Sequence, residues 1–365
     1  MIEQKNVILA VVISIVILLG WQYVYEGPRL AEQRARQEQQ QKEQAAQNLK
    51  SGSPVGAVAP KTAGPLIDGG AGQPRLGVDM SSANKDLMGG AVQPSPSESR
   101  EAALKASPRV PIRSERLDGS ISLLGGRIDD LLLRDYREEL DRSSPEIVVL
   151  RPIKSERPYY AEFGWLGKDV KLPTADTLWK TRGSRLSPKT PLLLTWDNGA
   201  GMIFERQYSL DDNFMITLTQ RVKNNTGKDV SLAPYGLLSR TGTPKLLGFY
   251  ILHEGLLGVF DEVLKEVDYS DLRDDGAQRQ STTGGWLGIT DKYWLAALIP
   301  DQTMKVETSF NAAKRGNLDL YQADYLAPPI VAKSGGVIET TNSLFAGAKE
   351  VKLLDKYETE NGVTG

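Results

Sequence analysis

The most constraining feature of this 365-residue sequence is an uncharged apolar run close to its N-terminus. Residues Val7 to Tyr25 read VILAVVISIVILLGWQYVY, and a helix of this length crosses the roughly 30 Å hydrocarbon core of a bilayer. A helix that is apolar on all sides is otherwise found only where protein surrounds it. The run therefore predicts one N-terminal transmembrane helix within residues 1–25, followed by a large aqueous region.

Three aromatic residues at the end of the run favour an uncleaved anchor over a secretory signal peptide. Trp21, Tyr23 and Tyr25 carry amphipathic rings of the kind that lie at the membrane–water interface. A signal peptide has a shorter apolar core and small residues at its cleavage site. We therefore expect a permanent span with these three rings at the interface.

The charges that flank the run leave its orientation open. Lys5 precedes the run, and four basic residues follow it: Arg29, Arg34, Arg36 and Lys42. The positive-inside rule would place the more basic side in the cytoplasm, but long domains translocate largely regardless of flanking charge. Charge alone decides for neither side.

Residues 26–109 are predicted to form a polar, disordered linker. The first part, up to residue 50, is rich in Gln, Glu, Arg and Ala and shows no apolar stripe that could pack on a partner. The second part is dominated by Gly, Pro, Ser and Ala, which cannot bury enough apolar surface to offset the entropy of ordering. A segment that folds only on a partner is the alternative.

From residue 110 to residue 346 the sequence has the pattern of a large antiparallel β-sandwich. Short apolar or alternating runs follow one another, with turn signals such as Gly125-Gly126 and Asn198-Gly199 between them and no regular strand–helix alternation. The predicted strands are 121–123, 128–133, 146–150, 159–165, 192–196, 202–208, 214–222, 230–238, 249–252, 286–290, 293–299, 303–310, 318–325 and 337–345.

The last segment, residues 347–365, is predicted to contain an amphipathic helix. Within AKEVKLLDKYETE, the side chains of Val351, Leu354 and Tyr357 recur at helical spacing, with Leu353 beside them. Packing of this apolar stripe on the sandwich is the simpler interpretation. A helix that faces a partner or the membrane is the alternative.

Composition excludes several kinds of chemistry. The formal net charge of −2 gives no general attraction to nucleic acid. The sequence has no cysteine, which removes disulfides, thiolate metal ligands and cysteine nucleophiles. Its one histidine, His253, would have to serve any Ser-His-Asp triad, and we expect it to be structural. No GxSxG, Walker or HExxH motif occurs.

Acidic pairs and tryptophans are the remaining candidates for a ligand site. Asp129-Asp130, Asp211-Asp212 and Asp274-Asp275 could supply glycosidase carboxylates or bind calcium, but each lies beside a turn or strand edge where solvated Asp is common. Five tryptophans could stack on sugars or fill the core, and we expect the core: Trp165, Trp179, Trp196, Trp286 and Trp294. No catalytic, cofactor or metal residue is predicted.

Several stretches of the sequence resemble a known family. The layout of membrane span, linker and β domain resembles the same family. The stretches are Gln4-Lys5-Asn6 before the apolar run, Trp21-Gln22, Leu117–Leu140, Gly284–Pro300 and Leu344–Glu358. The sequence resembles the N-terminal part of the YidC/Oxa1/Alb3 family of bacterial membrane protein insertases. The resemblance implies a β-super-sandwich similar to sugar mutarotases, an N-terminus in the cytoplasm and a large periplasmic domain on the inner membrane.

The resemblance also implies a function. Such proteins assist the insertion, folding and assembly of inner-membrane proteins, with and without the Sec translocon. Their partners are the lipid bilayer, nascent membrane proteins, and the translocon with its accessory subunits; no cofactor is implied. The family's five further spans, with a hydrophilic groove and an essential positive residue, would follow Gly365. By position, only the role of the helix nearest the insertase core transfers here, to Ala348–Glu360.

Two other functions stay open from the residues alone. The first is a membrane-anchored periplasmic module that binds or scaffolds carbohydrate or protein ligands. The second is an epimerase of mutarotase type, which would need an acid–base pair typically built from histidines and a Glu. Because His253 is the single histidine, we expect no enzyme.

Overall fold

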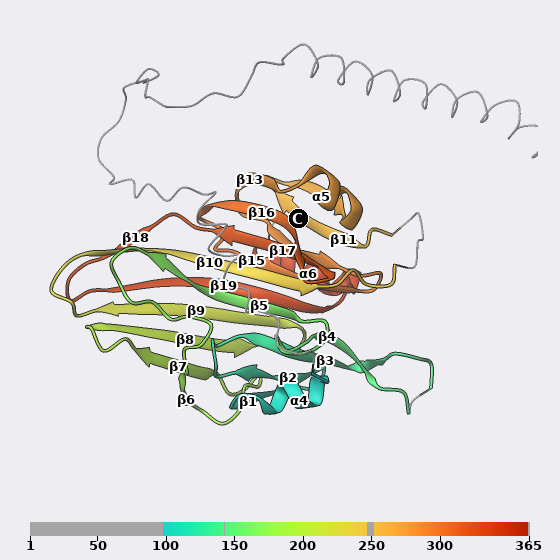
Figure 1. The fold of residues 1–365 in the computed structure, drawn as a ribbon, viewed down its shortest axis with the longest axis horizontal. Helices are drawn as coiled ribbons and strands as arrows, with labels where there is room; N and C mark the ends of the chain where they lie inside the picture. Colours follow the sequence, from blue (N-terminus) through green and yellow to red (C-terminus); the bar gives the residue numbers. More distant parts are fainter. Residues whose placement is uncertain (1–97, 142, 247–251, 364–365) are drawn as a thin grey trace, which may run out of the picture. The chain divides into compact units, whose positions relative to one another are not determined.

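The computed structural model describes residues 98–141, 143–246 and 252–363 (Figure 1). The predicted transmembrane helix with Trp21, Tyr23 and Tyr25, most of the predicted linker, and all but the last residue of the predicted strand 249–252 lie outside the described residues. Within the described ranges, no helix has the length and hydropathy that a bilayer span needs.

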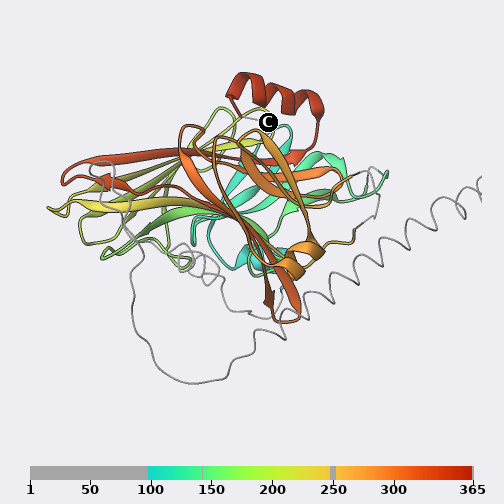
Figure 2. The same cartoon turned by 90° about the horizontal axis from the view of Figure 1, so that it is seen from above.

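Two antiparallel sheets pack face to face as a sandwich, as the alternating pattern predicts (Figures 1 and 2). The ten-stranded sheet contains β1 (Arg109–Arg113), β2 (Leu117–Ser122), β3 (Ile128–Arg137), β4 (Glu146–Leu150), β5 (Tyr159–Gly167), β10 (Val230–Thr241), β13 (Gln278–Thr283), β16 (Lys305–Arg315), β17 (Leu318–Leu326) and β18 (Ile330–Ala332). Its main path runs β1-β2-β3-β5-β10-β17-β16-β13.

The nine-stranded sheet has the order β12-β11-β14-β15-β19-β9-β8-β7-β6. Its strands are β6 (Lys180–Arg182), β7 (Leu192–Asp197), β8 (Met202–Leu210), β9 (Met215–Asn224), β11 (Gly255–Phe260), β12 (Val263–Asp268), β14 (Trp286–Thr290), β15 (Trp294–Ile299) and β19 (Val337–Ala348). Three helices complete the described part: α4 (Arg100–Lys105), α5 (Tyr269–Asp275) and α6 (Val351–Asn361).

Alternation along the strands builds the core between the sheets. On β8, every second side chain from Met202 to Leu210 is buried, and Phe204 and Tyr208 are essentially inaccessible. Successive residues of a strand point to opposite faces of the sheet, so all the side chains on one face of β8 pack in the core. The ring of Phe260 on β11 meets Phe310 on β16 at 5.9 Å between centroids, which marks the same interface at the other end of the sheet.

Arg206 ties the two sheets together. It lies on the core face of β8 and is only 4% exposed. Its Nη1 donates to the carbonyl oxygens of Gly125 at 3.1 Å and Gly126 at 3.0 Å, and its Nη2 donates to the carbonyl of Phe163 on β5. The guanidinium also lies over the ring of Trp179, with 4.4 Å from its carbon to the ring centroid. One buried cation therefore holds the β2–β3 turn and β5 against the opposite sheet.

The β2–β3 turn requires glycine for two reasons. Gly125 and Gly126 have φ values of 76° and 65°, in the left-handed region that residues with a Cβ rarely adopt. A Cβ on Gly126 would also lie 2.5 Å from Nη1 of Arg206. The turn predicted from the sequence is therefore confirmed, and its glycines make room for the buried arginine.

The structure differs from the predicted linker at its C-terminal end. Residues 98–108 carry the short helix α4, which packs on the sandwich through Ala103. Its Arg100 pairs with Asp130 on β3. A six-residue helix that docks through one buried side chain and one ion pair shows no periodic apolar pattern in the sequence.

The prediction that Asp129 and Asp130 are solvated is wrong. They are 2% and 3% exposed, and they are paired with Arg109 and Arg100. Burial raises the pKa of Asp129, and Arg109 opposes this effect. These carboxylates fix α4 and β1 to β3, which is a structural role.

Replacing Arg206 by Met should lower the free energy of unfolding by at least about 3 kcal/mol. The carbonyls of Gly125 and Phe163 would lose the Arg206 donor, and each buried group left without a partner costs about 1–3 kcal/mol. Chemical denaturation measures the change. The control is Arg113→Met, because the Arg113 side chain is 57% exposed and surface ion pairs contribute about 0–1 kcal/mol. Equal losses in the two variants would contradict the inter-sheet role.

Candidate functional site

The nine-stranded sheet is apolar over one part of the face that points away from the sandwich core, from β11 through β14 and β15 to the adjoining ends of β19 and β9. Strand register places Trp286 beside Val259, Ala297 beside Phe345, and Phe345 beside Met215, so these side chains share one face. Their sequence neighbours, such as Leu298 on β15, point the other way, into the core. A sheet with two apolar faces needs a second covering layer, and α6 supplies part of it (Figure 2).

The body of α6 docks through two side chains one helical turn apart. Leu353 and Tyr357 are 7% and 5% exposed, and the ring of Tyr357 meets Phe345 edge-on at 5.9 Å. The Tyr357 hydroxyl donates to Oδ2 of Asp211 at 2.5 Å and accepts from the backbone N–H of Phe214 at 3.4 Å. Burial and the Asp211 carboxylate raise the pKa of Tyr357 well above its usual value, so the hydroxyl stays protonated and keeps donating.

The N-terminus of α6 is held by an ionic network. Glu350 is the N-cap residue, but its side chain makes no cap hydrogen bond. Its carboxylate instead accepts from both Nη atoms of Arg116 and from the hydroxyl of Tyr136 at 2.6 Å. Arg116 also donates to Asp135 at 3.0 Å and stacks on the ring of Phe214, 4.1 Å from its centroid.

The pKa shifts in this network indicate which of its groups are charged. The hydrogen bond from Arg116 holds the pKa of Glu350 below its usual range, and that of Arg116 is raised by the same bond. Partial burial, with the hydrogen bond to Glu350, raises the pKa of Tyr136 to about 12. The network is therefore a carboxylate held by one cation and one neutral phenol throughout the neutral range.

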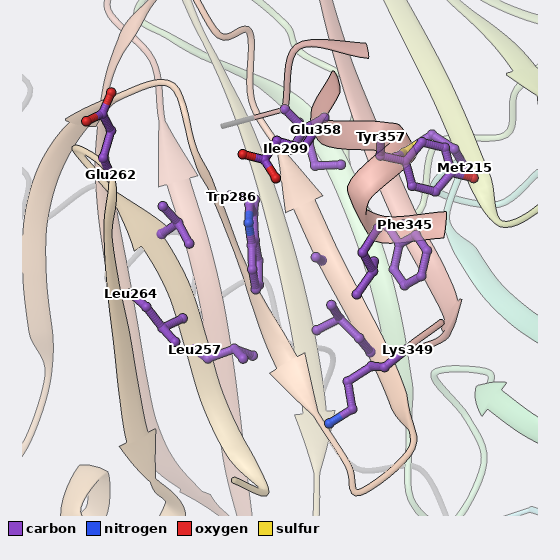
Figure 3. Close-up of a pocket in the computed structure, with 15 residues that line it drawn as sticks. Met215, Leu257, Glu262, Leu264, Trp286, Ile299, Phe345, Lys349, Tyr357 and Glu358 are labelled. Atoms are coloured by element: carbon purple, nitrogen blue, oxygen red, sulfur yellow. The ribbon is translucent and has the colours of Figure 1, made fainter. Parts of the chain in front are cut away.

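The helix does not cover the whole apolar face, and the uncovered part forms a groove of about 430 Å³ (Figure 3). Most of its lining is apolar: Met215, Leu257, Val259, Leu264, Trp286, Leu295, Ala297, Ile299, Phe345, Leu354, Tyr357 and Val363. Its charged lining residues are Glu262, Lys349 and Glu358. Figure 3 shows Glu262 and Glu358 toward one end of the groove, Trp286 in the middle and Lys349 at the other end.

The structure separates the residues of the predicted helical stripe. Leu353 and Tyr357 face the sheet, Leu354 lines the groove, and Val351 is 72% exposed. Val351 is the first residue of α6, where Glu350 fixes the direction in which the helix starts. The apolar side of α6 therefore contacts this domain, and Val351 faces outward.

Other predicted residues take structural positions. His253 Nε2 lies 2.9 Å from the carbonyl oxygen of Leu256, and Nδ1 lies 3.3 Å from Asp268, as expected for a structural histidine. Asp211 accepts from the backbone N–H groups of Asn213 and Met215, each at 2.9 Å, as well as from Tyr357. In the described ranges, no group of three His, Asp or Glu side chains could hold a metal ion.

The tryptophans divide between core and surface. Trp165 and Trp179 are in the core as predicted, at 5% and 2% exposed. Trp196, Trp286 and Trp294 are half-buried. Trp294 packs against Tyr136, with 4.9 Å between ring centroids, next to the network at the start of α6.

A buried carboxyl on the ten-stranded sheet escaped sequence analysis. Asp324 on β17 is 3% exposed and accepts from Nδ2 of Asn311 at 3.1 Å and Nε2 of Gln322 at 3.0 Å. Burial raises its pKa to about 6, against the effect of the two amides. The alternation of polar and apolar residues in β17 predicts an exposed polar face, so the pattern gave no sign of this burial.

Comparison with known proteins places this sandwich in a family. Residues 109–362 match the family model described as the YidC periplasmic domain. The chain belongs to the YidC family. A relative from Methylobacterium radiotolerans, named membrane protein insertase YidC, is 41% identical over 99% of this chain. The protein of the same name from Bradyrhizobium diazoefficiens is 42% identical over 97% of this chain.

This chain spans only part of those relatives, 58% of the first and 55% of the second. Among solved structures, a galactose mutarotase related enzyme from Lactobacillus acidophilus is similar over 67% of this chain and 99% of its own, with 11% identity and a TM-score of 0.47. The family model and the two relatives confirm the family resemblance seen in the sequence.

Replacing Leu353 by Ala should loosen α6, whereas replacing Val351 by Ala should not. A buried Leu→Ala change costs about 2–5 kcal/mol, and an exposed substitution on the same helix costs within about 0.5 kcal/mol. Hydrogen exchange of the α6 amides, followed by mass spectrometry, measures the difference. Faster exchange in the Val351 variant than in the Leu353 variant would contradict the docking face described here.

Replacing Asp324 by Asn should change how stability depends on pH. Because the folded-state pKa of Asp324 is about 6 and the unfolded value is about 3.9, the folded protein binds this proton more tightly. The parent therefore loses stability as pH rises from about 4 to about 6, by up to about 3 kcal/mol, and Asp324→Asn removes this loss. Thermal unfolding at pH 4 and pH 7 tests it. Parallel profiles for parent and variant would contradict the assignment.

Proposed function

We propose that this chain is the anchoring and periplasmic part of a membrane protein insertase of the bacterial inner membrane. Relatives named membrane protein insertase match it across 97–99% of its length at 41–42% identity, and this match is the observation that carries the proposal. The apolar run Val7–Tyr25 would anchor it, with the N-terminus in the cytoplasm and residues 110–346 in the periplasm.

In this proposal the domain positions the part of the insertase that follows it and recruits the partners of the insertase. It performs no chemistry. Its partners would be lipid, nascent membrane proteins, and the Sec translocon with its accessory subunits. The geometry of α6 supports a positioning role, because the helix is fixed at its start by Glu350 and along its body by Tyr357. A helix held at two points can transmit its orientation to whatever follows it.

The relatives are named insertases and not enzymes, and the site supports the same interpretation. Both ring nitrogens of His253 lie near a structural partner. The groove beside α6 has a largely apolar lining, whereas a carbohydrate site needs several convergent polar groups to fix the sugar's orientation. Of the alternatives raised by the sequence, a protein-binding surface fits this groove better than a sugar-binding one.

Depletion of the complete protein from its own bacterium should impair insertion of newly made inner-membrane proteins. The assay follows protease accessibility of a pulse-labelled membrane protein with a short periplasmic segment. Re-expression of the complete protein, or of a Val351→Asp variant, should restore insertion. A Leu353→Asp variant should restore it less, because a charge would lie in the α6 docking face. Normal insertion after depletion would refute the proposed function.

A further inference from the structure

We propose that the tip of the β14–β15 hairpin rests on the surface of an anionic phospholipid bilayer, with Tyr293 and Trp294 at the membrane–water interface. This inference rests on the proposed function, which tethers the domain to a membrane. It adds a second contact with lipid, made by the β domain itself and separate from the N-terminal apolar run.

The hairpin tip is short and its backbone is fixed. The N–H of Asp291 donates to the carbonyl of Trp294 at 2.9 Å, so Lys292 and Tyr293 are the two residues of the turn. The carbonyl of Tyr293 in turn accepts from the backbone N–H of Lys349 at 2.9 Å. The tip is therefore bonded both to its own hairpin and to the segment that leads into α6.

The tip presents aromatic rings to solvent. Tyr293 is 55% exposed, and its ring lies 6.1 Å from that of Trp294 between centroids. Trp294 is half-buried and meets the half-buried Tyr136 at 4.9 Å. Gly, Pro, Asn, Asp and Ser dominate turns, so the geometry of the turn does not explain a large ring at its tip.

A lysine beside the rings favours lipid over protein as the partner. Nζ of Lys292 lies 4.9 Å from the centroid of the Tyr293 ring. Protein–protein interfaces are enriched in aromatic residues but depleted in Lys. At the membrane–water interface, Tyr and Trp are enriched and Lys is also favoured. An ammonium beside the rings is attracted to anionic headgroups, which gives the lipid its preferred charge.

Two carboxylates touch the tip or its aromatic neighbours, and both are compensated within the domain. Asp291, in the hairpin itself, accepts from Nη1 of Arg240 at 2.8 Å. Glu350, which accepts from the Tyr136 hydroxyl, is paired with Arg116. Their repulsion of an anionic headgroup is therefore reduced, and the charge of Lys292 can act on the lipid.

The test uses the absence of cysteine from the sequence. Tyr293→Cys and Val337→Cys each introduce one thiol, which is labelled with the environment-sensitive fluorophore NBD. The two sites are similarly exposed, at 55% and 58%. Val337 begins β19, whereas Ala348 at the other end of that strand pairs with Trp294. Each labelled chain, otherwise intact, is placed in nanodiscs of phosphatidylglycerol and phosphatidylcholine, with or without a lipid that carries a nitroxide on its headgroup.

We expect the nitroxide lipid to quench NBD at residue 293 at least threefold more than NBD at residue 337. In the Tyr293→Cys background, Lys292→Glu should reduce this quenching at least twofold, because a carboxylate would replace the cation beside the headgroups. The control is Lys180→Glu, because Lys180 is also exposed but lies on β6, at the far edge of the nine-stranded sheet. It should leave the quenching unchanged. Unchanged thermal unfolding shows that each variant is folded.

Equal quenching at residues 293 and 337 would overturn the proposal, and so would equal effects of Lys292→Glu and Lys180→Glu. Because the nanodiscs contain no other membrane protein, an unquenched label at residue 293 would refute lipid contact and leave the tip to a protein partner. The insertion assay is independent of this measurement. A complete protein that restores insertion while its hairpin tip stays unquenched refutes this inference alone.

Discussion

Part of the nine-stranded sheet, from β11 to the start of β9, is apolar on both faces, and much of the domain's organisation follows from that constraint. One face is satisfied by the ten-stranded sheet, with Arg206 crossing the interface to bind carbonyls on the other side. The other face needs a cover, and α6 is too short to supply all of it. The groove is the part left open, so the docking of the helix and the existence of the groove have one physical cause.

Two arginines have different structural roles in this sandwich. Arg206 is buried among carbonyl oxygens and a tryptophan ring, where its charge is spread over several dipoles. Arg116 is partly exposed and faces a carboxylate, Glu350, that is also bonded to Tyr136. The first joins the layers and the second fixes the angle of a helix on them. Both use the planar fork of the guanidinium, which a lysine cannot reproduce.

Sequence reasoning captured what local patterns encode. The strands at Glu146–Leu150 and Trp286–Thr290 match their predicted bounds, because apolar runs between turn residues mark buried strands. It missed Val263–Asp268, whose mixed charges hide an edge strand. It also misplaced Asp129 and Val351. The burial of the first depends on arginines that approach from other elements, and the direction of the second depends on the Glu350 network. Contacts between residues far apart in the sequence determine both the burial of Asp129 and the direction of Val351. A local sequence pattern does not indicate such contacts.

The ion pair between Arg116 and Glu350 spans 234 residues, and this separation has a consequence for biogenesis. At synthesis rates of about 5–20 residues per second, Glu350 emerges roughly 10–50 s after Arg116. Until then the sheet has neither β19 nor α6, and Met215 on β9 has no partner on the outer face. Completion of the fold is thereby coupled to the end of the domain's own synthesis. Chains with such distant pairings fold slowly, so the domain acquires its final surface only after α6 has been made.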